Sequence, residues 1–199
     1  MNLGQVLLIM AALVILSFIT LSVNSMFLTK TTAILQSEAH LTAISIAQSM
    51  IDEIMTTGYD SATVSTKIYD STKFTPLSRL GPETSPGVNE ITTVTLPESP
   101  DTSVQYKSVT KYNDVDDYNN YRRFYYSRSL GTFAVVDTVF YVREADPNQT
   151  SSTPTFFKKI VVTVRHPNFM PPDAGRSYNP WQNRYYLQLS DVVVYRRYF

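Results

Sequence analysis

Cysteine is absent from this chain of 199 residues. Its absence excludes disulfide bonds, zinc sites built from thiolates and a cysteine nucleophile. An exported domain without disulfides must rely on its apolar core for stability. The supply of core residues is adequate, because the chain has 14 tyrosines, 10 phenylalanines and many valines and isoleucines.

Excess charge of either sign is also absent. The chain has 17 Lys and Arg residues against 17 Asp and Glu residues, and the basic residues form no cluster. Nucleic-acid binding requires concentrated positive charge that can neutralise phosphates. The composition therefore argues against a nucleic-acid partner, and no bulk charge directs the chain to an acidic lipid surface.

Sequence signatures of catalysis are missing as well. The chain has no Gly-x-Ser-x-Gly, no His-Glu-x-x-His and no phosphate-binding glycine loop, and its two histidines are His40 and His166. Two carboxylates could carry out acid–base chemistry, but their spacing marks out no such pair. We expect neither an enzyme nor a bound cofactor.

The N-terminal segment lacks charge completely. Its first 29 residues contain no ionisable side chain, and Lys30 is the first. They include the predominantly apolar run Val6–Val23, which has no proline or glycine, and a bilayer is crossed by about 20 such residues of helix. A secretory signal peptide has a basic start and an apolar stretch of about 7–15 residues. Because neither property fits, we expect the segment to remain in the mature protein.

Proline and glycine are missing from Gln5 to Thr57. This interval predicts one continuous helix of roughly 80 Å at about 1.5 Å per residue. Beyond Lys30, apolar residues recur at spacings of three, four and seven, which predicts a buried face formed by Ile34, Leu41, Ile44, Ala47, Ile51 and Ile54. Gly58 suits the left-handed position that often ends a helix.

After this helix the pattern changes. The stretch Tyr59–Gln105 holds five of the eleven prolines and indicates a long surface connection that contains one strand, Ile91–Leu96. Alternation typical of strands then predicts Val104–Lys111, Arg122–Ser129, Thr132–Arg143, Phe156–Arg165 and Arg184–Arg196. Because Thr132–Arg143 is apolar on both faces, we expect it to be a central strand covered by the helix on one side.

The predicted fold class is α+β, with a long N-terminal helix packed on a C-terminal antiparallel sheet. We expect three parts along the chain. Residues 1–29 form an apolar transmembrane or filament-core helix, residues 30–58 form its amphipathic continuation, and residues 59–199 form an extracellular β-rich domain.

Two loop motifs offer candidate binding or modification sites. Asp114, Asp116 and Asp117 supply oxygen donors of the kind that Ca²⁺ prefers. Their segment lacks the glycine and the glutamate of an EF-hand loop, so a structural Asx-rich turn is the favoured interpretation. Asn148 begins an Asn-Gln-Thr triplet, which fits the acceptor pattern for N-glycosylation.

The predicted helix and sheet together resemble the type IV pilins and the related minor pilins and pseudopilins. The similarity rests on the apolar N-terminus, the helical portion Ala43–Ile54, the acidic segment Asp114–Asn119, and Lys158–Val164 in a later strand. It implies a structural subunit that is anchored in a membrane, handled by pilus assembly machinery and polymerised with copies of itself into a filament at the cell surface.

The start of the chain departs from that family. Pilin precursors carry a short basic leader that ends in Gly, and a glutamate at the fifth mature position. Cleavage after Gly4 would place Ile9 at that position, whereas an already mature chain would place Gln5 there; the third alternative is that Met1 is retained without cleavage. Gln5 can form hydrogen bonds but cannot form an ion pair. The usual buried charge pairing is missing in every case.

Apolar helices can pack against one another as readily as against lipid, and a repeated head-to-tail contact gives an open helical polymer. We expect residues 1–29 in the filament core, with Gln5 as the polar contact. The predicted packing residues are Val6, Leu7, Leu8, Ile9, Leu13, Val14, Ile15, Leu16, Phe18, Ile19 and Leu21. Two alternatives stay open: a minor component of a pilus or type II secretion machine, and a single-pass membrane protein whose outer domain binds a partner without polymerising.

Overall fold

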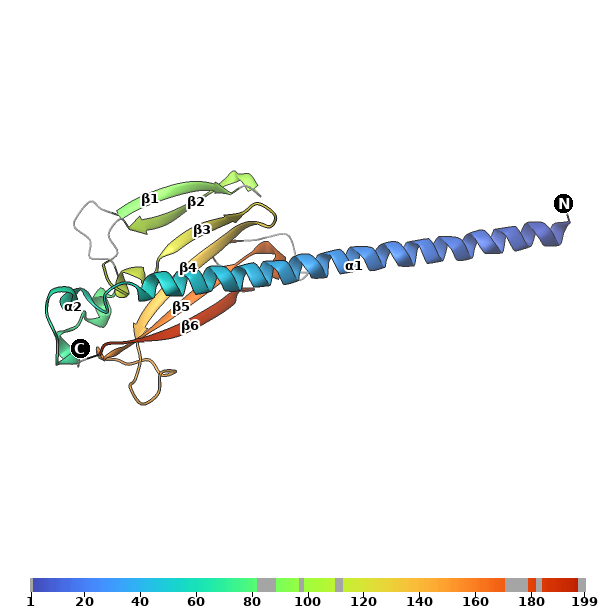
Figure 1. The fold of residues 1–199 in the computed structure, drawn as a ribbon. Coiled ribbons are helices and arrows are strands. Elements are labelled where there is room, and N and C mark those ends of the chain that lie inside the picture. Colours follow the sequence, from blue (N-terminus) through green and yellow to red (C-terminus); the bar gives the residue numbers. More distant parts are fainter. Residues whose placement is uncertain are drawn as a thin grey trace. The chain divides into compact units, whose positions relative to one another are not determined.

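A computed structural model of the chain describes residues 2–81, 89–96, 99–109, 113–170, 179–181 and 184–196. The chain divides into two compact units, Met1–Glu38 and Ala39–Phe199. One helix, α1 (Leu3–Met55), contributes to both units (Figure 1). The α+β fold class predicted from the sequence is confirmed.

The predicted long helix is confirmed to within two residues at its C-terminal end. No proline or glycine interrupts α1 after Gln5, so its backbone hydrogen bonds run without a break. Two threonines then close the last turn, because the hydroxyls of Thr56 and Thr57 each donate to a carbonyl three residues earlier at 2.7 Å. These bonds satisfy backbone carbonyls that the helix itself leaves unpaired.

The predicted role of Gly58 as a left-handed helix cap is wrong. Among the described glycines, positive φ angles occur at Gly81 and Gly131. Gly58 instead forms a parallel β-bridge with Asp114. Its N–H donates to the carbonyl of Asn113 at 3.1 Å, and its carbonyl accepts from the N–H of Val115 at 2.8 Å. The backbone groups at the helix end are thus paired by a distant loop.

Six strands form two antiparallel sheets. A hairpin pairs β1 (Asn89–Leu96) with β2 (Ser99–Val109). The larger sheet has the order β3-β4-β5-β6, formed by β3 (Arg122–Ser127), β4 (Gly131–Tyr141), β5 (Phe157–Arg165) and β6 (Leu187–Val194). Each predicted strand has a counterpart here, although Lys111 lies outside the described residues. As predicted, β4 is a central strand.

The predicted surface connection Tyr59–Gln105 is more structured than expected. It begins with α2 (Ser61–Ser65) and the 3₁₀ turns η1 (Ser71–Lys73) and η2 (Leu77–Arg79), and it ends inside β2. Residues 82–88 and 97–98 of this stretch lie outside the described residues. Two further 3₁₀ turns, η3 (Asp116–Tyr118) and η4 (Pro167–Phe169), flank the strands of the larger sheet.

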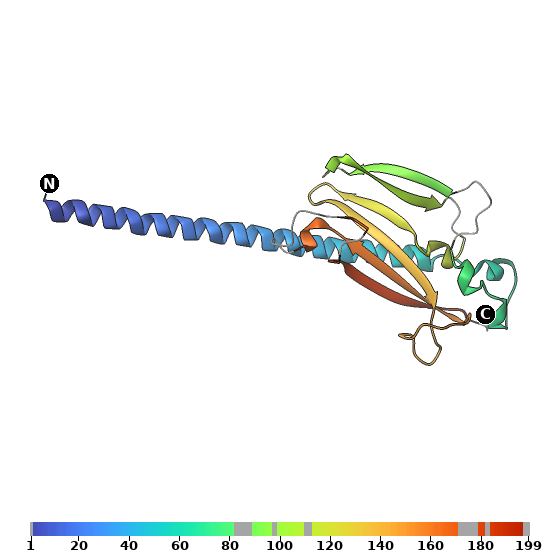
Figure 2. The same ribbon diagram turned by 180° about the vertical axis from the view of Figure 1, so that it is seen from behind.

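The second half of α1 packs on one face of the larger sheet, and the β1–β2 hairpin lies beside β3 (Figures 1 and 2). The buried side chains of this half are Ala39, Ala43, Ile46, Ala47, Met50, Ile51 and Ile54. They share one core with Phe133, Val135 and Val139 of β4 and with Ile160, Val162 and Val164 of β5. Three alanines at spacings of four bring the helix backbone close to the sheet.

The buried face predicted for α1 is only partly right. Its later members, Ala47, Ile51 and Ile54, are buried as predicted. Its earlier members, Ile34, Leu41 and Ile44, are exposed. Leu41 follows the buried Ala39 by two residues, which places it about 200° away around the helix. The prediction followed the larger aliphatic side chains and therefore chose the wrong face for the start of the contact, which is formed by the small residues Ala39 and Ala43.

Candidate functional site

The large apolar side chains of α1 lie uncovered along its first half. Every residue from Leu3 to Leu35 is exposed. The predicted packing residues range from 38% exposed at Val6 to 72% at Leu8, and they are Val6, Leu7, Leu8, Ile9, Leu13, Val14, Ile15, Leu16, Phe18, Ile19 and Leu21. We call the exposed apolar side chains of α1 from Leu3 to Ile44 the apolar helix surface. A helix that is apolar all round must be covered by lipid or by protein.

Four hydroxyl groups on this segment bond to the backbone of α1 itself. Ser17 donates to the carbonyl of Leu13 and Thr20 donates to the carbonyl of Leu16, both at 2.8 Å. Ser25 and Thr29 make similar bonds at 2.9 Å. Such pairing removes the need for water at these positions, which is the requirement for a helix inside lipid or inside a dry protein interface.

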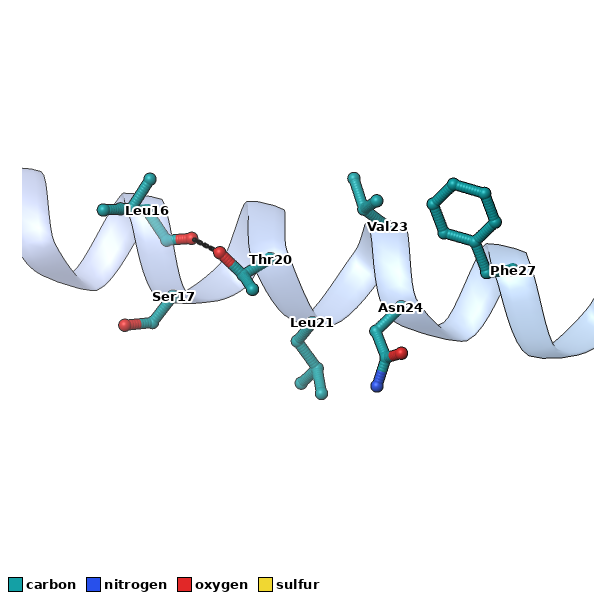
Figure 3. Close-up of a pocket in the computed structure, with 7 residues that line it drawn as sticks. All are labelled: Leu16, Ser17, Thr20, Leu21, Val23, Asn24 and Phe27. Carbon is teal, nitrogen blue, oxygen red and sulfur yellow. Dashed lines mark hydrogen bonds between the residues drawn. The ribbon is translucent and has the colours of Figure 1, made fainter.

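A shallow groove follows the middle of the apolar helix surface. Figure 3 shows the residues that line it: Leu16, Ser17, Thr20, Leu21, Val23, Asn24 and Phe27. Asn24 carries the one side-chain amide between Val6 and Leu28. Within the described part of the chain, no hydrogen bond reaches this amide. Covering the groove with lipid or an apolar partner would therefore leave Asn24 unpaired unless the partner supplies a polar group.

The apolar helix surface is long enough to cross a membrane. An 18-residue stretch of α1 meets the length and composition of a membrane span, and none of it is buried. A span takes about 20 residues. Exposed apolar side chains nevertheless continue past such a span, at Ile34, Leu35, Leu41 and Ile44.

Gln5 acts within its own helix turn. Its side-chain oxygen accepts a hydrogen bond from the N–H of Asn2 at 3.3 Å, and its own N–H donates to the carbonyl of Asn2 at 2.9 Å. The bond from the Asn2 N–H to the Gln5 side chain is one half of a capping box; the other half is replaced by a backbone bond. The first turn contains no acidic residue. The helix start therefore offers amide groups and no carboxylate.

The acidic segment forms a buried turn. One oxygen of Asp114 accepts from the N–H of Asp116 at 3.0 Å and from the N–H of Asp117 at 3.2 Å, which makes the predicted Asx-rich turn. Asp117 accepts from the N–H of Asn113 at 2.7 Å. No cluster of three metal-ligating side chains occurs in the described residues. Burial and the charges of Asp116 and Asp117 raise the pKa of Asp114 to about 8.

Sequence reasoning missed a buried lysine beside this turn. Lys158 of β5 is fully buried, and its ammonium has three acceptors. These are the Tyr59 carbonyl at 2.7 Å, Asp60 Oδ2 at 3.0 Å and Asp116 Oδ1 at 2.5 Å. The rings of Tyr59 and Tyr141 lie 4.6 and 5.3 Å from its Nζ. We call these five residues the lysine cluster.

Asp60 is the most strongly hydrogen-bonded carboxyl of the lysine cluster. It caps the start of α2 through a bond from the N–H of Ala62 at 3.2 Å, and it also accepts from the N–H of Thr75 at 3.0 Å and the Tyr141 hydroxyl at 3.2 Å. Burial alone would raise the pKa of Asp60, but the Lys158 ammonium and these bonds lower it below its ordinary value. For Asp116, burial outweighs the attraction of Lys158 and raises the pKa.

The remaining candidates lie apart from both features. Asn148 is exposed in the loop after β4, where its side-chain oxygen accepts from Lys159 Nζ at 3.2 Å. His40 stacks on Phe169 with ring centroids 4.5 Å apart. His166 caps η4, because its Nδ1 accepts from the N–H of Asn168 at 3.2 Å. His166 also stacks on Phe133 with ring centroids 4.2 Å apart, and both histidines contact the ring of Phe169.

The fold and these surfaces define a class: an α+β protein whose N-terminal helix is long and apolar enough to cross a membrane. The sequence matches no protein-family model and no curated protein, and the structure matches no solved structure.

Proposed function

We propose that this chain is a structural, non-enzymatic subunit of an extracellular pilus-like filament, and that it polymerises through the apolar helix surface. The observation that supports this proposal most is the length of that surface. Uncovered apolar side chains begin at Leu3 and recur as far as Ile44. A bilayer would cover about 20 residues of helix and leave the rest in water.

Neighbouring copies of the helix can cover what lipid leaves exposed. Leu41 is 69% exposed and Ile34 is 65% exposed, although both lie beyond a span that starts at Val6. Each aliphatic side chain that becomes fully buried contributes about 1.5–3 kcal/mol. A staggered array of identical helices would bury these residues together with the membrane-length segment, and its repeated contact would extend into a filament.

Assembly on this surface does not depend on an ion pair. The first turn of α1 has no acidic residue, and Gln5 bonds to Asn2. Salt screens charge interactions but strengthens or leaves unchanged the burial of apolar groups. We therefore expect filaments that persist in high salt and dissociate in detergent. This property would distinguish the chain from pilins that use a glutamate near the N-terminus.

The membrane-span character of α1 supports two alternatives. A minor component of a pilus or secretion machine would use the same surface in few copies. A single-pass membrane protein would use only the span, and its outer domain would bind a partner. The second alternative leaves Ile34, Leu41 and Ile44 without a covering surface.

Electron microscopy of sheared cell-surface material, combined with peptide identification in the purified filaments, tests the proposal. We expect peptides of this chain as the main component. Recovery of the chain solely as a discrete particle in detergent-solubilised membranes would contradict it. Mass spectrometry of the N-terminal peptide would show whether the mature chain begins at Met1, at Gln5 or elsewhere.

A further inference from the structure

The lysine cluster brings an amine and two carboxyl groups together in a place that water does not reach. Lys158 and Asp60 are 0% exposed and Asp116 is 1% exposed. The three side chains come from β5, from the start of α2 and from η3, so only the folded domain assembles them. Their contacts are independent of the apolar helix surface and of any filament.

We propose that Lys158 and Asp116 condense into an intramolecular amide, an isopeptide bond between Lys158 Nζ and Asp116 Cγ, and that Asp60 is the base that permits it. Lys158 Nζ lies 2.5 Å from Asp116 Oδ1, which places the amine against the carboxyl group that it would attack. Well-oriented groups of one molecule react as if at an effective concentration of about 10⁵–10⁸ M. The two residues are separated by 42 positions in the sequence, so the bond would cross-link η3 to β5.

Asp60 has the properties of the base. Its carboxylate is held by the N–H groups of Ala62 and Thr75 and by the Tyr141 hydroxyl, and its Oδ2 is 3.0 Å from Lys158 Nζ. Its pKa lies below the ordinary value, so it is present as the carboxylate, and its Oδ2 is placed to take a proton from Lys158 Nζ as the amine adds to Asp116. The same contacts hold Asp60 away from reaction, because both of its oxygens already accept hydrogen bonds.

Asp116 has the properties of the acceptor of the amine. Amines attack neutral carboxylic acids and not carboxylates, and burial raises the pKa of Asp116. The Tyr59 and Tyr141 rings cover Lys158 Nζ, and exclusion of water disfavours hydrolysis of the product.

The reaction balances without an external reagent. The Lys158 ammonium transfers one proton to Asp60, and the neutral amine adds to Cγ of the protonated Asp116. The tetrahedral adduct then loses its hydroxyl together with a second nitrogen proton, which leave as one water molecule. The amide nitrogen keeps the third proton, Asp60 ends protonated, and the total charge of the three groups is zero before and after.

Tryptic mapping of the purified full-length chain tests the bond. Trypsin does not cleave after an acylated lysine, so peptides 112–122 and 144–159 should appear joined, with a mass one water below their sum. We expect most of the folded chain in this form. Complete recovery of the separate peptide 144–158 would overturn the proposal, since that peptide requires a free Lys158 amine.

Variants assign the roles of the three residues. Lys158→Arg and Asp116→Ala should remove the cross-link, and Lys159→Arg, at the exposed neighbour, should retain it. Asp60→Asn keeps a good helix N-cap but removes the base, so the cross-link should form at least ten times more slowly. A water loss that persists in Lys158→Arg would overturn the proposal in favour of a succinimide. A cross-link that joins Lys158 to Asp60 would overturn the assigned roles.

Discussion

The two halves of α1 have the same secondary structure and opposite surroundings. From Ala39 to Ile54, seven side chains are buried against the larger sheet. From Leu3 to Leu35, every residue is exposed, although this half is the more apolar one. The comparison teaches that local sequence determines the helix, whereas contact with the sheet determines which half is covered. The stripe that starts at Ala39 and Ala43 and continues to Ile54 packs against the sheet, and the leucines and isoleucines of the first half remain available to another surface.

The largest effect should follow from a charge placed in the uncovered half. Phe18→Asp puts a carboxylate on the apolar helix surface, and Asp at the centre of a membrane span costs about 2.5–3.5 kcal/mol. We expect filaments to disappear in electron micrographs while the unit Ala39–Phe199, the outer domain of the proposed filament, stays folded by circular dichroism. The matched control is Tyr69→Asp, in the outer domain, because Tyr69 is exposed to a similar degree. Normal filaments from Phe18→Asp would contradict the proposal that the uncovered half of α1 forms the filament contact.

A cavity in the half of α1 that packs on the sheet should act on the stability of the domain and not on filament assembly. Met50 is 0% exposed, and truncation of a buried methionine to alanine costs about 2–5 kcal/mol. We expect Met50→Ala to lower the free energy of unfolding of the outer domain by that amount in urea titrations monitored by fluorescence of Trp181. Leu41→Ala, on the exposed side of the same helix segment, should change it by less than about 0.5 kcal/mol. Equal losses of unfolding free energy in Met50→Ala and Leu41→Ala would contradict the assignment of one buried and one exposed side to this helix segment.

A change of pH should affect the outer domain and spare the uncharged half. Burial, opposed by the charge of Arg123, raises the pKa of Asp137 to about 8, and neither of its carboxyl oxygens has a hydrogen-bond partner in the described structure. Between about pH 4 and pH 8 the folded domain therefore holds a proton that the unfolded chain releases, so stability falls as the pH rises. Asp114 adds to this decline in the same direction.

Asp137→Asn should flatten that decline by more than about 1.4 kcal/mol, the worth of one pKa unit. The measurement is the unfolding free energy at a series of pH values. Membrane partition of the chain should change much less between pH 4 and pH 7, because the first 29 residues have no ionisable side chain. An unchanged slope in Asp137→Asn would show that Asp137 titrates normally.

The smallest effect should come from the groove amide. Asn24→Leu removes the one side-chain amide between Val6 and Leu28, and hydrogen bonds between helices in membranes contribute about 0.6–2 kcal/mol. We expect weaker or less regular association, measured as a lower detergent concentration for filament dissociation. Ser17→Ala is the control, because the Ser17 hydroxyl already bonds to Leu13. Stronger association in Asn24→Leu would mean that the amide has no partner.

Much of the fold was predictable because its signals are local. The helix follows from an interval without proline or glycine, and the strands follow from alternation. The start of the buried stripe was not predictable in the same way, because Ala39 and Ala43 carry little apolar surface. Their role depends on how closely the sheet approaches. The cap of the helix was mispredicted because Gly58 pairs with Asp114, 56 positions later in the sequence.

For the lysine cluster, the sequence indicates the burial of Lys158 but not the residues that pair with it. Alternation along β5 places Lys158 on the same face as the buried Ile160 and Val162, so its burial could have been inferred. Its partners could not, because Asp60 lies 98 positions away and Asp116 lies 42 positions away. A buried charge requires a partner, but the sequence alone does not say which of the 17 acidic residues it is.

The bridge between Gly58 and Asp114 also has a mechanical consequence. Tension applied along α1 is transmitted past the helix end at Met55 to Gly58, only a few residues later. There, two backbone hydrogen bonds connect the chain to the residues before η3. Lys158 holds the next two residues through the Tyr59 carbonyl and the Asp60 carboxylate. The pull therefore passes into a central strand of the sheet before the loops that follow can extend, and the domain should respond to stretching as a stiff body with little slack at its attachment point.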